Sequence, residues 1–190
     1  MTRAYDNPFA TDRVLACRHD PQGWTWDVLM DRMRAMRYRG AIVGPKGSGK
    51  TTLLDDLRPR LADAGVPTVI LRLWDEKRRL DPDDWRRVTD ATESGAIILL
   101  DGAEQLSLVR WLQFVHHARP CRGLIVTLHR PGRLPTLVET TTSPALLRRI
   151  AASLDPAHAL EDAEDLHARH AGNLREALRE LYDRRAAGSP

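Results

Sequence analysis

The sequence predicts an α/β protein in which helices cover both faces of a parallel five-stranded sheet, a three-layer α/β/α sandwich, followed by a small α-helical lid. Short apolar segments alternate with longer amphipathic ones along residues 38–142, as expected when each crossover helix returns the chain to a new parallel strand. Residues 96–100 form an unbroken apolar run, which suits a strand buried on both faces. From residue 143 onward the apolar residues keep helical spacing, so this part is predicted to be helical.

The length and composition are those of an ordinary globular protein. The chain has 190 residues, 42% of them apolar and 29% charged, so one domain of about 100–200 residues with a small appendage is expected. No apolar run approaches the roughly 20 residues that span a bilayer, and residues 1–10 lack the pattern of a secretory signal. Cys17 and Cys121 lie far apart, without metal-ligand spacing. We therefore expect a cytoplasmic protein with no membrane partner.

Residues 1–37 are predicted to form an N-terminal segment that ends in an amphipathic helix. Its first part, through Gly23, is rich in turn-forming residues and holds one short apolar stretch, residues 14–17. Thr25 is the expected N-cap of the helix. Apolar side chains then recur at helical spacing, at Trp26, Leu29, Met30, Met33 and Met36.

The core, residues 38–142, is expected to contain five strands joined by helices. The strands cover residues 40–43, 68–73, 96–101, 124–128 and 136–138. A helix over 51–64 is expected to kink at Pro59, because proline removes an internal hydrogen bond. A short helix begins at Pro82, and another helix spans 104–118. The lid, residues 143–190, is expected to contain helices over 144–154, 160–170 and 173–185.

The loop after the first strand matches the Walker A pattern G-x-x-x-x-G-K-[ST] in full, with a strand before it and a helix after it. Glycines let consecutive backbone N–H groups face a phosphate, and the helix N-terminus adds partial positive charge. Lys50 would reach the β- and γ-phosphates of ATP, and the Thr51 hydroxyl would ligate Mg²⁺. The predicted nucleotide-binding residues are Gly44, Pro45, Lys46, Gly47, Ser48, Gly49, Lys50, Thr51 and Thr52.

Lysine is scarce, because 26 of the 29 basic residues are arginine. Lys50 has a chemical reason to be lysine, since the broad guanidinium of arginine would not fit the same space. Lys46, in the same loop, is expected to be solvated; the alternative is that it adds to the local positive potential. The net charge is +3, and acids match arginines along residues 143–190, so nucleic-acid binding is not favoured; a basic face would favour it.

Asp101 ends the apolar run and is the expected acid that holds the water shell of Mg²⁺. The segment Asp101-Gly102-Ala103-Glu104 resembles the D-G-x-[DE] Walker B form of STAND/NACHT-type NTPases, relatives of AAA+ ATPases. The resemblance implies that Glu104 is the catalytic acid that polarises the attacking water. The alternative is that Glu104 only stabilises the start of a helix through the helix dipole.

Two further segments carry the resemblance. Residues 127–131, Thr-Leu-His-Arg-Pro, loosely resemble the STAND T-S-R-P segment, which implies that Thr127 or His129 contacts the γ-phosphate or the water. Residues 172–175, Gly-Asn-Leu-Arg, resemble the AAA+ sensor 2 motif, which implies that Arg175 reaches the γ-phosphate from the lid. Asn173 with Glu176 also fits a capping box, and both interpretations can hold together.

The chain departs from the standard AAA+ pattern at the arginine finger. Between the fourth and fifth strands only a short loop, residues 130–135, stands where those modules insert a helix. The resemblance therefore does not extend to a trans-acting arginine finger or to the obligate ring that depends on one. The weak finger candidates are Arg130, Arg133, Arg148 and Arg149. A zinc site formed by His116, His117, Cys121 and His129 is not expected, because no recognised ligand spacing occurs.

The leading function is Mg²⁺-dependent ATP binding and hydrolysis by an AAA+/STAND-like P-loop ATPase, resembling small stand-alone bacterial AAA-like ATPases, that acts as a switch or motor on a protein partner. One alternative is a P-loop small-molecule kinase, with Asp75 and Glu76 as acceptor-binding acids. The other is an ATP-dependent nucleic-acid adaptor similar to a transposition helper. The sequence leaves open the partner, the oligomeric state and the preference for ATP over GTP.

Overall fold

The computed structural model describes residues 7–17, 23–156 and 160–187 of the chain. Its contacts divide the chain into two compact units. The sheet unit comprises residues 20–44 and 53–139, and the helical unit comprises residues 1–19, 45–52 and 140–190. By its contacts, the phosphate-loop sequence therefore belongs with the helical unit.

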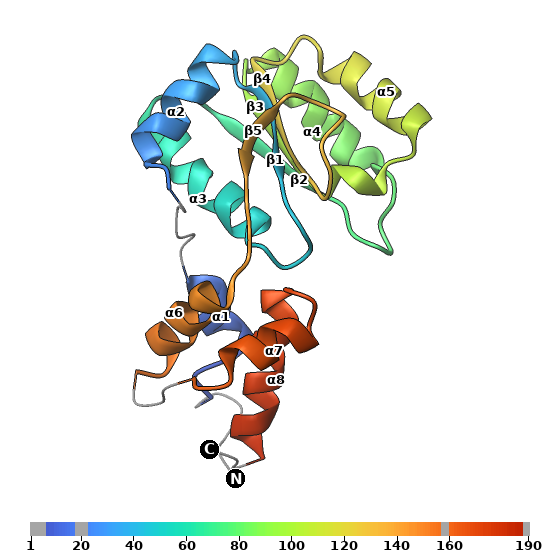
Figure 1. Ribbon diagram of the computed structural model, residues 1–190. Helices are drawn as coiled ribbons and strands as arrows, with labels where there is room; N and C mark the ends of the chain where they lie inside the picture. Colours follow the sequence, from blue (N-terminus) through green and yellow to red (C-terminus); the bar gives the residue numbers. More distant parts are fainter. Residues whose placement is uncertain (1–6, 18–22, 157–159, 188–190) are drawn as a thin grey trace. The chain divides into compact units, whose positions relative to one another are not determined.

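The sheet unit is built on five parallel strands (Figure 1). The strands are β1 (Arg39–Val43), β2 (Thr68–Arg72), β3 (Ile97–Asp101), β4 (Gly123–Leu128) and β5 (Thr136–Glu139). Their order across the sheet is β2-β3-β4-β1-β5, with every neighbouring pair parallel. The predicted parallel five-stranded sheet is confirmed, and β4 lies between the strand that leads into the phosphate loop and the strand that ends at Asp101.

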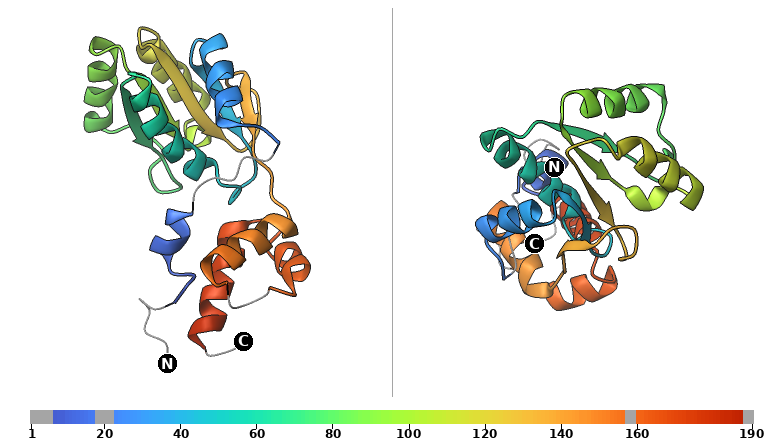
Figure 2. Two further views of the ribbon diagram at one scale, coloured as in Figure 1. Left: turned by 90° about the vertical axis from the view of Figure 1, so that its left-hand side faces the viewer. Right: turned by 90° about the horizontal axis from the view of Figure 1, so that it is seen from above.

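Helices cover both faces of this sheet (Figures 1 and 2). One face is covered by α2 (Trp26–Ala35) and by α3 (Lys50–Asp63), of which the residues from Leu53 onward belong to the sheet unit. The other face is covered by α4 (Pro82–Glu93) and α5 (Leu108–Ala118). Thr25 caps α2 by accepting from the Val28 N–H, as predicted. The three-layer α/β/α architecture is therefore confirmed.

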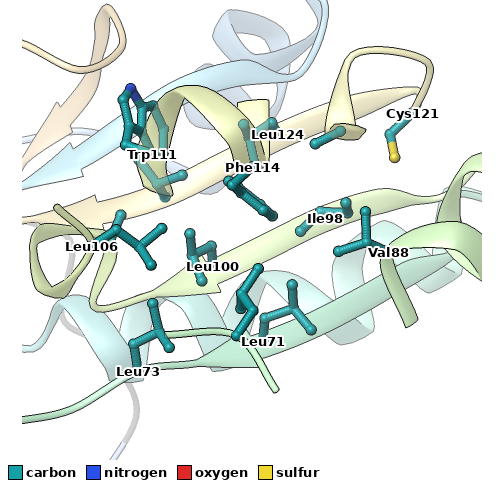
Figure 3. Packing of buried hydrophobic residues seen from close by; sticks show 14 of the residues in the cluster. Leu71, Leu73, Val88, Ile98, Leu100, Leu106, Trp111, Phe114, Cys121 and Leu124 are labelled. Atoms are coloured by element: carbon teal, nitrogen blue, oxygen red, sulfur yellow. The ribbon is translucent and has the colours of Figure 1, made fainter. Parts of the chain in front are cut away.

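The unbroken apolar run of β3 follows from burial on both faces. Ile98 and Leu100 point toward α4 and α5, where they join Phe114 and Trp111 in one core (Figure 3). Ile97 and Leu99 belong to the other core, under α2 and α3. Because successive side chains of a strand point to opposite faces, a strand between two helical layers needs an apolar residue at every position.

Several element boundaries differ from the sequence predictions. The helix predicted over 104–118 is two elements, a 3₁₀ turn η2 (Ala103–Gln105) and then α5, whose N-cap is Ser107. The helix α3 begins at Lys50 and continues through Pro59. A helix that the sequence analysis missed, α1 (Thr11–Ala16), occurs near the N-terminus. Its six residues are too few for a clear helical periodicity.

The helical unit has its own apolar core. Its C-terminal helices are α6 (Pro144–Leu154), α7 (Ala163–Arg169) and α8 (Leu174–Ala186), so the predicted helical character of this part is confirmed. The helix predicted over residues 160–170 starts later in the structure, so residues 160–162 precede α7. Phe9 packs in this core, and the Asn7 side-chain amide donates to the Tyr182 carbonyl (2.9 Å), so residues 7–17 contact the C-terminal helices.

Among the helices that the structure describes, none has both the length and the apolar character needed to cross a membrane.

Candidate functional site

The phosphate-loop sequence adopts a glycine-dependent turn that leads into a helix. Gly47 and Gly49 have φ values of +78° and +83°, which residues with a Cβ rarely adopt. The Ser48 hydroxyl donates to the Pro45 carbonyl (2.8 Å) and lies 2.7 Å from the Thr140 hydroxyl. Ser48 therefore bonds within the loop and also connects the loop to Thr140. The helix α3 starts at Lys50, and its first N–H groups have no intrahelical acceptors. This end of α3 is therefore electropositive and suited to an anion.

The Lys50 ammonium is held inside the loop. Its Nζ donates to the Pro45 carbonyl (2.8 Å), and the residue is only 7% exposed. A buried charge is costly unless it is paired or hydrogen-bonded. An anionic phosphate group is the partner that the N-terminus of α3 and this ammonium would together favour.

The N-terminus of α8 packs against the same loop within the helical unit. Asn173 is the N-cap of α8, and its side-chain oxygen accepts from the N–H groups of Arg175 (3.2 Å) and Glu176 (3.4 Å). A Cβ added to Gly47 would lie 2.0 Å from that oxygen, so Gly47 and Asn173 are in close contact. Asn173 therefore caps the helix as predicted, and the exposed Arg175 follows it in the first turn.

In the sheet unit, Thr127 holds Asp101. The Thr127 hydroxyl, on β4, donates to Asp101 Oδ1 at the end of β3 (2.6 Å) and accepts from the Gly102 N–H (2.8 Å). Thr127 is 1% exposed, and its single hydroxyl proton is used by Asp101. Gly102 has a φ of +78°, and an added Cβ would lie 2.3 Å from the Leu73 carbonyl oxygen. The geometry therefore makes Thr127 a positioning residue for the carboxylate of Asp101.

Replacing Thr127 with valine is expected to lower the free energy of unfolding by about 1–3 kcal/mol, because it leaves the buried Gly102 N–H without an acceptor at nearly unchanged side-chain volume. Chemical denaturation of the variant and of the wild type measures this difference. Thr127→Ser keeps the hydroxyl and serves as the matched control, with a smaller expected loss. Equal stability of Thr127→Val and the wild type would contradict the role given to this hydroxyl.

Glu104 and His129 form a pair beside this group. Glu104 lies in η2, and its Oε1 is 3.1 Å from Nε2 of His129, which follows β4. The side chains of His129 and Glu104 are 42% and 24% exposed. The second carboxylate oxygen, Oε2, is buried and has no hydrogen-bond partner among the described residues. A carboxylate held at one oxygen, with the other unsatisfied, is arranged to accept one more hydrogen bond.

Arg133 fixes the turn that carries Glu104. Its guanidinium donates to the carbonyls of Ala103 (2.7 Å) and Leu106 (2.6 Å) and lies over the Trp111 ring. Burial lowers the pKa of Arg133, and the charge of Glu104 partly offsets this change. Arg133 is a weak arginine-finger candidate by sequence, and its contacts give it a structural role.

The structure thus brings the sequence-predicted residues together in two groups. The loop group in the helical unit contains Ser48 and Lys50, with Asn173 and Arg175 at the start of α8. The strand-end group in the sheet unit contains Asp101, Glu104, Thr127 and His129. Gly44, where the loop sequence begins, follows β1 and donates its N–H to the Leu128 carbonyl (3.1 Å), at the carboxyl ends of the strands. The sequence analysis assigned no role to Thr140, the hydroxyl partner of Ser48, because no motif marks it.

The comparisons with known proteins support the fold. No protein-family model matches the sequence, and no curated protein matches it. Among solved structures, the chain resembles the replication initiator DnaA bound to AMPPCP and single-stranded DNA, with a TM-score of 0.54 and 14% sequence identity. The fold is that of a P-loop NTPase. The match covers 84% of this chain and 59% of the DnaA chain, so this chain spans about three fifths of that protein.

The described residues contain no group of three or more His, Cys, Asp or Glu side chains that could hold a metal ion.

Proposed function

We propose that this protein binds ATP with Mg²⁺ and hydrolyses it. The observation that supports this most is the buried Lys50 ammonium in a glycine loop at the start of α3, in a chain with a P-loop NTPase fold. Lys50 and the N–H groups of residues 46–51 would bind the phosphates, and the hydroxyl of Thr51 would ligate Mg²⁺. Asp101, oriented by Thr127, would hold water molecules of the metal. When bound, Mg²⁺ would neutralise charge on the β- and γ-phosphates.

Glu104 is the acidic residue proposed to act as the general base in hydrolysis. Its carboxylate would accept a proton from the water whose oxygen attacks the γ-phosphorus, while the bond from that phosphorus to the bridging oxygen breaks and the electrons leave with ADP. His129, 3.1 Å from Glu104, would hold the orientation of the carboxylate. Arg175 would add positive charge near the γ-phosphate from the start of α8.

The contact between Gly47 and Asn173 supports a nucleotide-dependent switch. Asn173, the N-cap of α8, packs directly on Gly47 of the loop. A bound phosphate that changes the conformation of the loop would therefore also change the contacts of Asn173. We propose that this movement acts on a protein partner in the cytoplasm. DnaA, with which the fold is shared, was solved with a nucleotide analogue, which is in keeping with nucleotide binding at this loop.

Phosphate release by the purified protein tests the proposal. We expect release from ATP in the presence of Mg²⁺, and background release when the metal is chelated. A parallel screen with sugar and nucleoside acceptors tests the kinase alternative. Absence of both ATP binding and hydrolysis would contradict the proposal, and turnover that requires an acceptor would favour the kinase.

A further inference from the structure

Two long segments of this chain contain no acidic residue. Residues 32–54 hold six basic residues and no Asp or Glu, and residues 105–138 hold five arginines and no Asp or Glu. Acids match arginines along residues 143–190, but this balance does not extend to these two segments. The strands β1 and β4, which belong to one segment each, are parallel neighbours in the sheet. The fold therefore gathers positive charge that the sequence separates.

The charge is concentrated where β1 and β4 begin. We define the amino-edge patch as Arg37, Tyr38, Arg39, Arg119 and Arg122. Arg39 donates to the carbonyls of Arg119 (2.8 Å) and Cys121 (3.0 Å), and the Leu124 N–H donates to the Tyr38 carbonyl (2.8 Å). The Arg122 guanidinium lies 5.6 Å from the centre of the Tyr38 ring. These contacts join the two loops into one surface on which Arg37, Arg119 and Arg122 are exposed.

The backbone of the patch is strained at the residues that carry its side chains. Arg37 and Tyr38 have consecutive positive φ values of 51° and 55°. Such positions favour glycine or asparagine, because a Cβ crowds the backbone there. Arg37 directly follows the C-cap of α2, where a left-handed residue commonly ends a helix: the Tyr38 N–H donates to the Met33 carbonyl (2.7 Å) and the Arg37 N–H donates to the Arg34 carbonyl (2.9 Å). The uncommon feature is that an arginine and a tyrosine occupy these two positions.

Helix ends explain only part of this charge. Arginine near a helix C-terminus stabilises the helix dipole, and Arg32 and Arg34 lie in the last turn of α2. Arg34 also pairs with Asp31. Arg37 directly follows the C-cap of α2 and Arg119 is the C-cap of α5, so their charges also suit the helix dipoles. Arg122 lies in the loop before β4 and faces a ring, and no helix end explains it. A ligand that carries several negative charges would explain why Arg122 is arginine and why residues 32–54 and 105–138 hold no acid.

We propose that the amino-edge patch binds the phosphodiester backbone of nucleic acid. Guanidinium groups match phosphate oxygens through paired hydrogen bonds, and the Arg122 guanidinium, supported by the partly buried Tyr38 ring, offers a plane on which an unpaired base can stack. Among the described residues, the large exposed apolar side chains are Val28, Trp74, Leu108, Val109 and Leu112, none of which lies in the patch. Insertion into a membrane would need such side chains, and purely electrostatic attraction to anionic lipid is weak, about 1 kcal/mol per basic residue, so we favour nucleic acid. The patch lies at the amino ends of the strands, the opposite edge from Asp101, so this proposal does not depend on ATP hydrolysis.

Fluorescence anisotropy with a labelled 20-nucleotide DNA, single-stranded and as a duplex, tests the proposal on the full-length protein. We expect the double variant Arg119→Ala/Arg122→Ala to bind at least tenfold more weakly than the wild type. The slope of log Kd against log salt concentration should fall by about 1.4 for single strands, because each lost phosphate contact removes about 0.7. Arg58→Ala/Arg87→Ala, which removes two exposed arginines from α3 and α4 and the same net charge, is the matched control and should stay within about twofold of the wild type.

Arg37→Gly separates binding from folding. Glycine removes the charge and relieves the positive φ, so we expect weaker DNA binding with an equal or higher melting temperature. Phosphate release should stay at the wild-type level in every patch variant, which keeps a failure here distinct from a failure of the proposed ATPase function. The proposal is overturned if neither DNA form binds at low salt, if the control variant weakens binding as much as the patch variant, or if only vesicles with anionic lipid bind.

Discussion

Replacing Lys50 with alanine is expected to lower Mg²⁺-dependent phosphate release at least about 100-fold, the usual loss when one preorganised electrostatic group is removed from a reacting centre. The Lys50 ammonium is buried and bonded to the Pro45 carbonyl, so it is already aimed within the loop before a phosphate arrives. Alanine removes the ammonium that the loop itself aims at the β- and γ-phosphates. Steady-state phosphate release and the binding of a fluorescent ATP analogue measure the loss in turnover and in affinity.

Lys46→Ala is the matched control, because it removes the same charge from the same loop. Lys46 is exposed, and we expect phosphate release within about twofold of the wild type, as for most exposed surface changes. Lys50→Arg keeps the positive charge but changes its geometry. We expect phosphate release by this variant also to be strongly reduced, because the planar guanidinium group does not fit the space of the compact ammonium group. Wild-type turnover in Lys50→Ala would show that this loop does not serve the reaction. A melting temperature near that of the wild type is required before a loss is assigned to the site.

The sheet could be predicted because its signal is local. A strand such as β3 has apolar residues at every position, and each position contacts one of two helical layers. The start of α5 was harder to place, because both Glu104 and Ser107 are residues that favour a helix N-terminus. The structure uses both, Glu104 in the 3₁₀ turn η2 and Ser107 as the N-cap of α5.

The contacts within the candidate site depend on strand order, which the sequence does not reveal. Thr127 reaches Asp101 only because β4 is the neighbour of β3 in the sheet. Ser48 and Thr140 are 92 positions apart, and no motif connects them. The sequence therefore indicates candidate residues, while their contacts depend on the tertiary fold.

Lys77, the third lysine, shows a further limit of motif reasoning. Its ammonium bridges the carboxylates of Asp81 (2.8 Å) and Asp84 (2.7 Å), which together form the capping box of α4. Burial lowers the pKa of Lys77, but these two carboxylates outweigh that effect and the pKa is raised. The ammonium therefore stays charged and holds the start of α4, a purely structural reason to keep a lysine.

Replacing Glu104 with glutamine is expected to lower turnover at least about 100-fold while ATP binding is retained, as for the loss of a general base. Glutamine has nearly the same shape, so it preserves the packing of η2, but its amide cannot accept the proton of the attacking water. The arrangement favours this role, because Oε1 is held by His129 and Oε2 is buried without a described partner. Single-turnover phosphate release and equilibrium binding of ATP measure the two quantities separately.

His129→Gln distinguishes a carboxylate that reacts from one that only stabilises the start of a helix. If Glu104 takes the proton, loosening its orientation should lower kcat several-fold with little change in KM, a smaller loss than that of Glu104→Gln. If Glu104 serves only the helix dipole, both variants should turn over at the wild-type rate, and Glu104→Gln should lose a few tenths of a kcal/mol of stability, up to about 1 kcal/mol. Normal turnover in a Glu104→Gln protein that binds ATP would remove Glu104 from the mechanism and leave Asp101, held by Thr127, as the acid of the strand-end group.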